Sequence, residues 1–370
     1  MCKKNRPFNE GLNPLDTLAQ SETRNFNESC LIKSNSEVYD DLSLNCSTSS
    51  DNTKSLTNRA KRKYLSYDLA LGLVDVAKNK AASAIDFVNY NQAQEGQRAY
   101  WNMYHCASRV EVVNGKATSK YCKNRLCMVC NSIRTAVLIK SYEPIVEEWN
   151  EPYFVTLTAQ TVNSDNLKAR IDEMMLIVNK IQLTIKKRLQ RSKLEPMKGL
   201  RKMECTYRPK TRKYHPHFHF IIDGKENAKE FLKMWLERTK HLGSKGTKEA
   251  GQDCKKADAG SLKELFKYFT KIVSNGETKD DRFIYLEPLH TIFQAIKGIR
   301  TFQSFGFSLP KIDNKELEKV ENIDVNGKDE EEYFWVQDAS DWVSYESGNC
   351  LSGYKVSEGM KELKNKMIKK

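Results

Sequence analysis

Three of the six histidines in this chain lie at alternate positions in residues 214–222, within a run of aromatic and β-branched residues. Successive side chains of a β-strand point to opposite faces, so His215, His217 and His219 share one face of the predicted strand. Imidazole is a common metal ligand, and a strand holds two such rings about 7 Å apart at Cα without the entropy of a loop. The spacing therefore predicts a divalent-metal site. The alternative is a partly exposed strand with incidental histidines.

A carboxylate is expected beside these imidazoles. Residues 199–207 are predicted to form a strand and residues 208–213 a basic turn, after which the histidine strand returns antiparallel. In that hairpin Glu204 and the histidine face lie side by side. One carboxylate with two imidazoles suits Mn²⁺ or Mg²⁺, which keep open positions for a phosphate oxygen. The alternative for Glu204 is an ordinary solvent-facing strand position.

Another set of reactive side chains lies in residues 261–271, Ser-Leu-Lys-Glu-Leu-Phe-Lys-Tyr-Phe-Thr-Lys. Ser261 is predicted to cap a helix, with Glu264 closing a capping box. Helical spacing then places Glu264, Tyr268 and Lys271 on one face. A phenol with a pKa near ~10 is a weak nucleophile, but a nearby ammonium and a metal-polarised phosphate would make its attack feasible. The alternative is a surface tyrosine with an ordinary helical neighbour.

Four cysteines form the pattern C-x15-C-x4-C-x2-C, at Cys106, Cys122, Cys127 and Cys130. The last two thiolates can reach one ion across a tight turn, and the first two would complete a tetrahedral structural Zn²⁺ site. Two alternatives stay open: unligated reduced thiols, or a redox pair, although no thioredoxin-like βαβ pattern surrounds the C-x2-C. Ten cysteines in 370 residues are too dilute for a disulfide scaffold.

The net charge of +13 is concentrated in the middle of the chain. Residues 61–310 carry 44 Lys and Arg against 26 Asp and Glu, whereas residues 1–60 carry 7 against 8 and residues 311–370 carry 10 against 14. Because Lys and Arg displace condensed counterions from phosphate backbones, this distribution predicts a polyanionic partner. A solvated lysine-rich surface is the alternative.

No apolar run approaches the length of a membrane span and the first residues lack an apolar signal core, which predicts a cytoplasmic protein with no membrane partner.

Residues 1–60 are rich in Asn, Ser and Thr and are predicted to be a disordered tail. Residues 61–100 show helical periodicity, residues 153–158 are typical of a strand, and an apolar stripe from Leu167 to Leu189 predicts a long helix. The chain has no GxxxxGK[ST] phosphate-binding loop, which argues against a fused helicase.

In their order along the chain, these motifs resemble those of the replication initiator proteins of rolling-circle plasmids, members of the HUH endonuclease superfamily. Residues 153–159 resemble the first family motif, a strand ending in Thr-Leu-Thr. Residues 215–222 resemble the metal-binding motif, and residues 264–271 resemble the motif that carries the catalytic tyrosine. Residues 121–130 are similar to a cysteine segment of one plasmid branch, and the likeness extends to residues 295–306.

The resemblance implies an α+β fold, with a central antiparallel sheet, the histidines on a middle strand, and flanking helices, preceded by the cysteine-rich zinc segment. The resemblance covers about residues 100–307, and together with the composition of the two ends it leads us to expect four parts in this chain. They are a disordered N-terminal tail at 1–60, a helical entry and cysteine-rich segment at 61–135, a nicking and DNA-binding domain at 136–310, and a C-terminal tail of unknown role at 311–370.

The same resemblance implies roles for the site residues. His217 and His219 would be the metal ligands and Tyr268 the nucleophile. Helical spacing, rather than the resemblance, places Lys271 where it would help to lower the barrier to attack. Glu264 would activate water or a DNA hydroxyl in the terminating step. A single tyrosine in the motif places the chain with the plasmid branch that uses such a glutamate.

The implied reaction is a metal-assisted transesterification on origin DNA, presented single-stranded or as a cruciform. It leaves a 5′-phosphotyrosyl link and a 3′-hydroxyl that a host DNA polymerase extends, while a host helicase unwinds the duplex. The sequence leaves open the third metal ligand (Glu204 or His215), the physiological ion, the origin sequence and the oligomeric state.

Two other functions also stay open. An HUH transposase or relaxase would use the same histidine chemistry on a different element. A non-catalytic, zinc-containing DNA-binding regulator would keep the histidines for structure alone.

Overall fold

The computed structural model describes residues 52–242, 246–258, 261, 265, 283–308, 322–325, 328 and 330–368. All of them fall within one unit of the chain, residues 38–370. The predicted nucleophile Tyr268 and its helical neighbours Glu264 and Lys271 lie outside the described residues, as does most of the predicted N-terminal tail.

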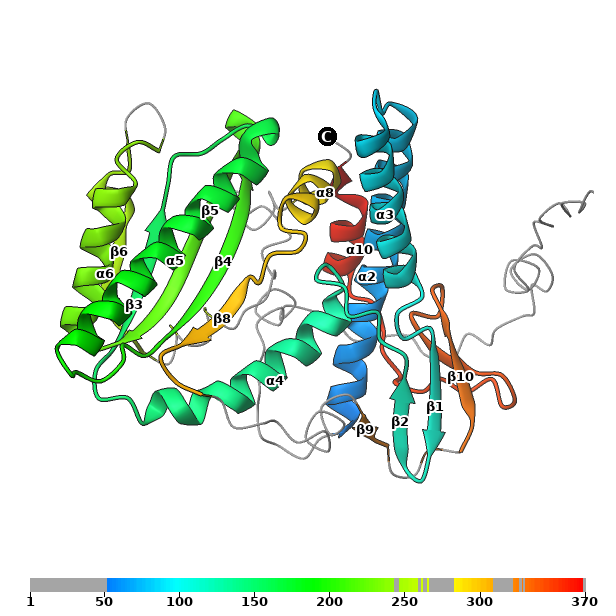
Figure 1. The fold of residues 1–370 in the computed structure, drawn as a ribbon. Helices are drawn as coiled ribbons and strands as arrows, with labels where there is room; N and C mark the ends of the chain where they lie inside the picture. The colour runs from blue at the N-terminus through cyan, green and yellow to red at the C-terminus, as the bar shows by residue number, and fades with distance from the viewer. Residues whose placement is uncertain are drawn as a thin grey trace, which may run out of the picture. The chain divides into compact units, whose positions relative to one another are not determined.

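The histidine strand is the middle strand of a five-stranded antiparallel sheet, here called the histidine sheet (Figure 1). Its strand order is β6-β3-β5-β4-β8. The strands are Asp253–Lys256 (β6), Pro152–Thr158 (β3), Lys213–Asp223 (β5), Gly199–Arg208 (β4) and Phe302–Phe305 (β8). Antiparallel sheets flanked by helices confirm the predicted α+β class, with the histidines on a central strand.

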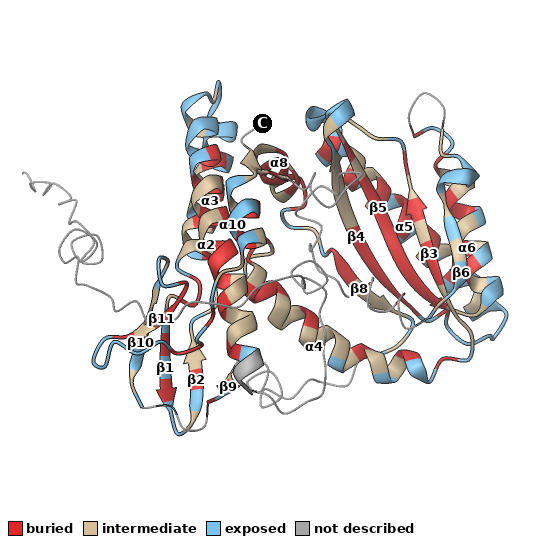
Figure 2. Ribbon diagram, turned by 180° about the vertical axis from the view of Figure 1, so that it is seen from behind, coloured by how far each residue is buried: buried red, intermediate tan, exposed pale blue. Residues whose placement is uncertain are grey.

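Two helices cover one face of the histidine sheet, α5 (Leu167–Arg191) and α6 (Lys225–Arg238) (Figure 1). They pack against Phe218, Phe220 and Ile222 of β5, and Figure 2 shows most of β5 as buried. The predicted apolar stripe of α5 is buried at Leu167, Ile171, Met174, Val178, Ile181 and Ile185. Because strand side chains alternate, burying the β5 aromatics here turns the histidines to the other face.

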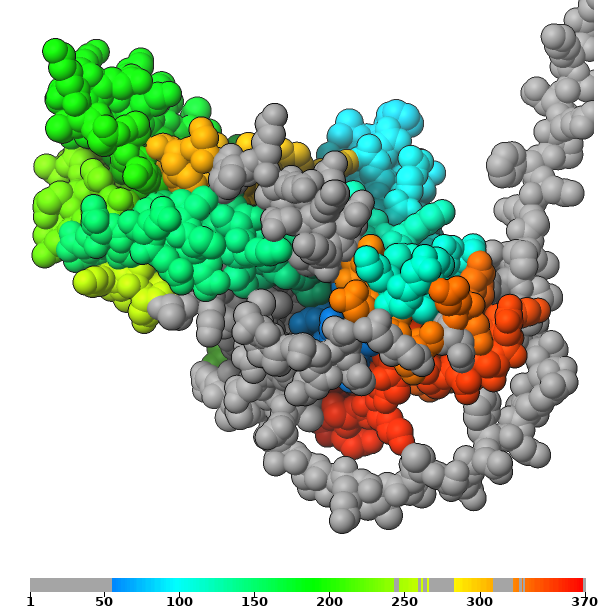
Figure 3. All heavy atoms as spheres, turned by 90° about the horizontal axis from the view of Figure 1, so that it is seen from below, coloured from blue at the N-terminus to red at the C-terminus, as the bar shows by residue number. Residues whose placement is uncertain are grey.

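The other face of the sheet carries a smaller apolar cluster. Helix α4 (Met128–Glu147) contributes Tyr142 and Val146, which lie in one cluster with Ile221 of β5 and with Leu265. Figure 3 shows the atoms of α4 as a continuous band of surface in the view from below. Leu265 is fully buried in this cluster, and it belongs to the motif of the predicted nucleophile, residues 264–271.

A second region, here called the cysteine region, is built on helices α2 (Asn52–Ala82) and α3 (Phe87–Tyr104) and on another antiparallel sheet. This sheet has the order β11-β10-β1-β2-β9. Its strands are Asp341–Ser344 (β11), Glu332–Val336 (β10), Arg109–Val113 (β1), Lys116–Ser119 (β2) and Ile323–Asp324 (β9). Other short elements among the described residues include Ile284–Tyr285 (β7), Leu286–Ala295 (α8), Glu358–Asn365 (α10) and Met367–Ile368 (β12).

The cysteine region departs from the sequence prediction in three places. Helix α2 begins at Asn52, before the expected boundary at residue 60. A hairpin joins β1 to β2 through Asn114 and Gly115, whose φ angles of 49° and 67° are those that an Asn-Gly turn adopts. Within the expected C-terminal tail, β9 pairs with β2 and β10 with β1, so these residues complete a sheet.

None of the described helices combines the length and the apolar character that a membrane span requires.

Candidate metal centres

Glu204, His217 and His219 come together on the histidine sheet, on the face opposite α5 and α6. Glu204 is the direct partner of His217 across the β4–β5 ladder. Its Oε2 lies 3.5 Å from Nε2 of His217 and 3.7 Å from Nε2 of His219. All their ligand atoms lie within 4.8 Å of one another. These three residues are called the histidine cluster below.

The donors of the histidine cluster fit a divalent ion with open positions. Imidazole nitrogens and a carboxylate oxygen are ligands for Mn²⁺ and Mg²⁺, and an octahedral ion with bonds of about 2.1 Å keeps its ligands within such distances. Three protein ligands leave coordination positions for water or for a phosphate oxygen. The side chain of Glu204 is 14% exposed, so the cluster is largely buried but still reached by solvent.

Both imidazoles are held through their Nδ1 atoms. Nδ1 of His217 donates to the backbone carbonyl of His215 at 3.0 Å, which leaves the lone pair of the neutral ring on Nε2. Nδ1 of His219 lies 3.1 Å from Oγ1 of Thr156 on β3. When Nδ1 carries the proton of this hydrogen bond, Nε2 of His219 is also available to an ion.

Lys202 shares the face of the histidine cluster and forms an ion pair with Oε1 of Glu204. Burial acts to raise the pKa of Glu204, but the Lys202 ammonium and the histidines outweigh it and hold that pKa well below its ordinary value. Glu204 is therefore ionised throughout the neutral range, as a metal ligand must be.

His215 lies on the same side of β5 but outside the histidine cluster. Its ring stacks on His217 with 5.2 Å between centroids, and its ladder partner is Thr206. Burial, together with His217 and Arg208, lowers the pKa of His215 to about 4, so its ring is neutral at pH 7. This geometry favours Glu204 over His215 as the third ligand.

The start of the predicted tyrosine helix differs from the sequence prediction. Ser261 is already helical, and its N–H donates to Oδ1 of Asp258 at 2.6 Å. Oγ of Ser261 in turn accepts from the N–H of Asp258 at 3.2 Å. The prediction that Ser261 is the N-cap is wrong, because Ser261 already has helical backbone and its own N–H is satisfied by the Asp258 carboxylate. Glu264, the predicted partner of Ser261, lies outside the described residues.

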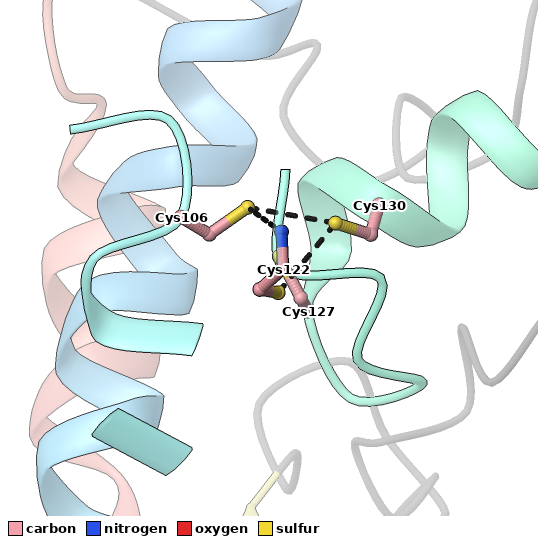
Figure 4. Close-up of side chains that lie close together, drawn as sticks. All are labelled: Cys106, Cys122, Cys127 and Cys130. Carbon is pink, nitrogen blue, oxygen red and sulfur yellow. Dashed lines mark hydrogen bonds between the residues drawn. The ribbon is translucent and has the colours of Figure 1, made fainter. Parts of the chain in front are cut away.

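The four cysteines predicted to bind zinc come together at the start of α4 (Figure 4). Sγ of Cys106 and Sγ of Cys122 lie 3.5 Å and 3.6 Å from Sγ of Cys130, and all four sulfurs lie within 4.8 Å of one another. Tetrahedral Zn–S bonds of about 2.3 Å place sulfurs about 3.8 Å apart. This cysteine cluster therefore fits a structural Zn²⁺ ion.

The backbone around the cysteine cluster is arranged to stabilise thiolates. The N–H of Lys123 donates to Sγ of Cys130 at 3.2 Å, and the N–H of Asn124 donates to Sγ of Cys122 at 3.4 Å. Lys123 has a φ of 57°, the left-handed conformation that turns these N–H groups toward the sulfurs. Hydrogen bonds from the other three thiols lower the pKa of Cys127 well below its ordinary value, although burial opposes this.

A buried lysine balances the charge of these thiols. Lys63 on α2 is fully buried, and its Nζ donates to the carbonyl of Tyr104 at 2.7 Å and to Oγ of Ser108 at 3.1 Å. Burial lowers the pKa of Lys63 to about 8, while attraction to the four cysteines acts in the opposite direction. A cation in this position offsets the negative charge of a tetrathiolate site.

Two residues of the histidine sheet were missed by sequence reasoning. Thr156 holds His219, and Lys202 holds Glu204. Because side chains alternate along a strand, the sequence alone could have placed both residues on the face of the histidine cluster. Thr156 belongs to the Thr-Leu-Thr motif of β3, and Lys202 stands two positions before Glu204, on the same face.

Comparison with known proteins identifies a family. Residues 115–348, more than half of the chain, match the family model described as "Replication protein". Two proteins named "Protein rep", from Bacillus sp and Bacillus amyloliquefaciens, are 32% and 31% identical over 121 residues. Those matches cover 31% of this chain and 38% and 34% of the relatives. A "Protein rep" from Streptococcus pneumoniae serotype 2 is 26% identical over 172 residues, covering 40% of this chain and 50% of the relative.

The chain thus spans about a third to a half of the length of these curated relatives. No solved structure matches it. The resemblance to replication proteins that the motifs indicated is confirmed, and the chain belongs to the replication protein family.

Proposed function

We propose that this chain is the initiator of rolling-circle replication of a plasmid, which binds the double-strand origin and nicks one DNA strand. The observation that carries the proposal is the histidine cluster, two imidazoles and a carboxylate on central strands of an antiparallel sheet, in a member of the replication protein family. Glu204, His217 and His219 would hold Mn²⁺ or Mg²⁺, which when bound polarises the scissile phosphate and offsets its developing charge.

Tyr268 is the proposed nucleophile. Its phenolic oxygen gives up its proton and forms a bond to the scissile phosphorus, and the bond from phosphorus to the 3′ oxygen breaks. The 3′ oxygen takes up a proton and becomes the hydroxyl that a host polymerase extends, while the 5′ phosphate stays on Tyr268. One phosphodiester replaces another, so the reaction needs no nucleotide cofactor. Lys271 would lower the barrier to this attack, and Glu264 would activate the second nucleophile in termination.

The remaining parts of the chain have supporting roles in this proposal. The basic middle of the chain would hold the phosphate backbone of the origin. The cysteine cluster would hold a structural Zn²⁺ ion. A host helicase would supply unwinding, because the sequence contains no phosphate-binding loop of the GxxxxGK[ST] type.

Cleavage of an end-labelled, single-stranded origin oligonucleotide tests the proposal. With Mn²⁺ the protein should cut at one position, and with EDTA it should not cut. Tyr268→Phe should abolish cleavage but keep origin binding within a few-fold, because one hydroxyl is lost and the basic surface is unchanged. Tyr345→Phe, at a tyrosine that is 80% exposed in the cysteine region, is the matched control and should cleave normally.

Each failure in this assay points to a different function. Origin binding by the wild-type protein without cleavage would favour a zinc-containing regulator. Full cleavage by Tyr268→Phe would exclude Tyr268 as the nucleophile. Nicking confined to a transposon end or a transfer origin would favour a transposase or a relaxase.

A further inference from the structure

Two buried cations stand side by side on β4, and the proposed nicking reaction assigns a step to neither of them. Arg201 and Lys202 are each 1% exposed. Strand alternation turns Arg201 toward α5 and Lys202 toward the histidine cluster. Because a buried charge is costly unless it is paired, the partner of each cation indicates what the cation does.

The two partners differ in kind. Arg201 donates to the side-chain oxygens of Asn179 at 3.1 Å and Gln303 at 2.7 Å, two neutral amides that tie β4 to α5 and to β8. Lys202 pairs instead with the carboxylate of Glu204, a member of the histidine cluster. Arg201 therefore serves the packing of the sheet, whereas Lys202 acts on the metal site.

Lys202 separates the tasks of the two oxygens of Glu204. Oε1 is held by the Lys202 ammonium, while Oε2 faces Nε2 of His217 at 3.5 Å and Nε2 of His219 at 3.7 Å. A carboxylate without such a neighbour can turn and give both oxygens to one ion. With Oε1 occupied, only Oε2 is presented to the site.

We propose that Lys202 is a positioning residue of the nicking site, which makes Glu204 a one-oxygen ligand and cancels its charge. This inference rests on the proposed function. Because both imidazoles are neutral ligands and the carboxylate is paired, a bound divalent ion keeps its double positive charge toward the scissile phosphate. The site binds its ion more weakly as a result, and it attracts the phosphate oxygens more strongly.

The test measures Mn²⁺ affinity by electron paramagnetic resonance of free Mn²⁺, without DNA, in three variants at Lys202. Lys202→Met and Lys202→Gln remove the charge, and both should bind Mn²⁺ at least about ten-fold more tightly than the wild-type protein. Lys202→Gln still donates to Oε1, so it serves if the methionine variant does not fold. Lys202→Arg keeps the charge and should stay within about three-fold of the wild-type affinity.

Nicking at saturating Mn²⁺ supplies the second readout. Both neutral variants should nick about ten-fold more slowly, since the phosphate then faces less positive charge. Arg201→Met is the matched control, because it removes the adjacent buried cation on the opposite face. It should lower the melting temperature and leave the Mn²⁺ affinity unchanged.

Unchanged or weaker Mn²⁺ binding in both neutral variants would show that Lys202 only supports the fold, and would overturn the proposal. Tighter binding with an unchanged nicking rate would overturn the charge argument. Mn²⁺ binding is read without DNA, so a wild-type protein that binds the ion but never nicks would contradict the proposed function and leave the test of Lys202 valid.

Discussion

The two candidate metal centres of this chain differ in how much room they leave around an ion. The cysteine cluster offers four sulfurs, which fill a tetrahedral coordination sphere and leave no position for a substrate. The histidine cluster offers two nitrogens and one oxygen, which leave positions open. We therefore propose a structural role for an ion in the cysteine region and a chemical role for an ion in the histidine sheet.

The two centres also differ in how they are assembled. The histidine cluster comes from two neighbouring strands of one hairpin, which the sheet holds in place with or without an ion. The cysteine cluster joins the segment after α3, the segment after β2 and the first turn of α4. Loss of an ion from the cysteine cluster should therefore disrupt the cysteine region, whereas loss of an ion from the histidine cluster should leave the histidine sheet folded.

The largest expected effect is the loss of zinc from the cysteine cluster. Cys127→Ala should abolish zinc binding and destabilise the cysteine region by several kcal/mol, since structural zinc contributes on the order of 10 kcal/mol to folding in small domains. Elemental analysis and thermal unfolding measure the two effects. Cys350→Ala, at an exposed cysteine outside the cluster, should change neither. Wild-type protein that contains no zinc, when made without chelators, would leave these residues as ordinary thiols.

The next effect concerns the histidine cluster. His217→Ala and His219→Ala should each weaken Mn²⁺ binding by about 100-fold or more and stop nicking, while the melting temperature changes by only a few degrees. His241→Ala is the control, because this exposed histidine pairs with Glu173 on α5, away from the cluster. If calorimetry gave the wild-type Mn²⁺ affinity for both cluster variants, the ion would have to bind elsewhere.

The histidine sheet was largely predictable because its chemistry follows local periodicity. The alternation at His217 and His219, the Thr-Leu-Thr strand and the apolar stripe of α5 each depend on short-range spacing, and the structure has all of them. The pairing of Glu204 with His217 followed once the hairpin was assumed. Lys202 was missed because a lysine two positions before a glutamate is usually a solvated pair, whereas here it lies on a strand that pairs with β5 on one side and β8 on the other and is buried.

A third effect separates the two halves of the proposed reaction. Glu264→Ala should still form the first nick but fail to release unit-length circles, so that longer multimers accumulate. Asp258→Ala is the matched control, since Asp258 accepts a hydrogen bond from the N–H of Ser261 and its loss should weaken this segment without removing a reactive group. The control should slow initiation and termination alike. Normal release of unit-length circles by a folded Glu264→Ala protein would remove the proposed role.

The smallest effect is a pH dependence of stability. Burial, aided by Lys80, lowers the pKa of His290 to about 4, and Nδ1 of His290 lies 2.8 Å from the hydroxyl of Tyr100. The unfolded chain takes up this proton near pH ~6.5. Stability should therefore fall as the pH drops from about 6.5 to about 4, by at most about 3 kcal/mol. Denaturant unfolding of His290→Gln should show a smaller loss over this range, and an unchanged pH profile would contradict the assignment.

The cysteine region was less predictable because its contacts are remote in sequence. Strand β10 pairs with β1, so Glu332 lies beside Glu111 although more than two hundred residues separate them. No local sequence pattern predicts that contact. The Asn114-Gly115 turn is a short-range hairpin signal that sequence reasoning passed over. The four cysteines were recognised from their spacing, whereas the buried Lys63 beside them depends on the fold of α2.

The central claim is that the histidine sheet performs ion-dependent transesterification with Tyr268 as the nucleophile. The most direct measurement is mass spectrometry of peptides after the protein has reacted with an origin oligonucleotide, with Mn²⁺ or with EDTA. We expect a nucleotide phosphate attached to the peptide that contains Tyr268, present with Mn²⁺ and absent with EDTA. An adduct on another tyrosine, or strand cleavage with no protein adduct, would contradict it.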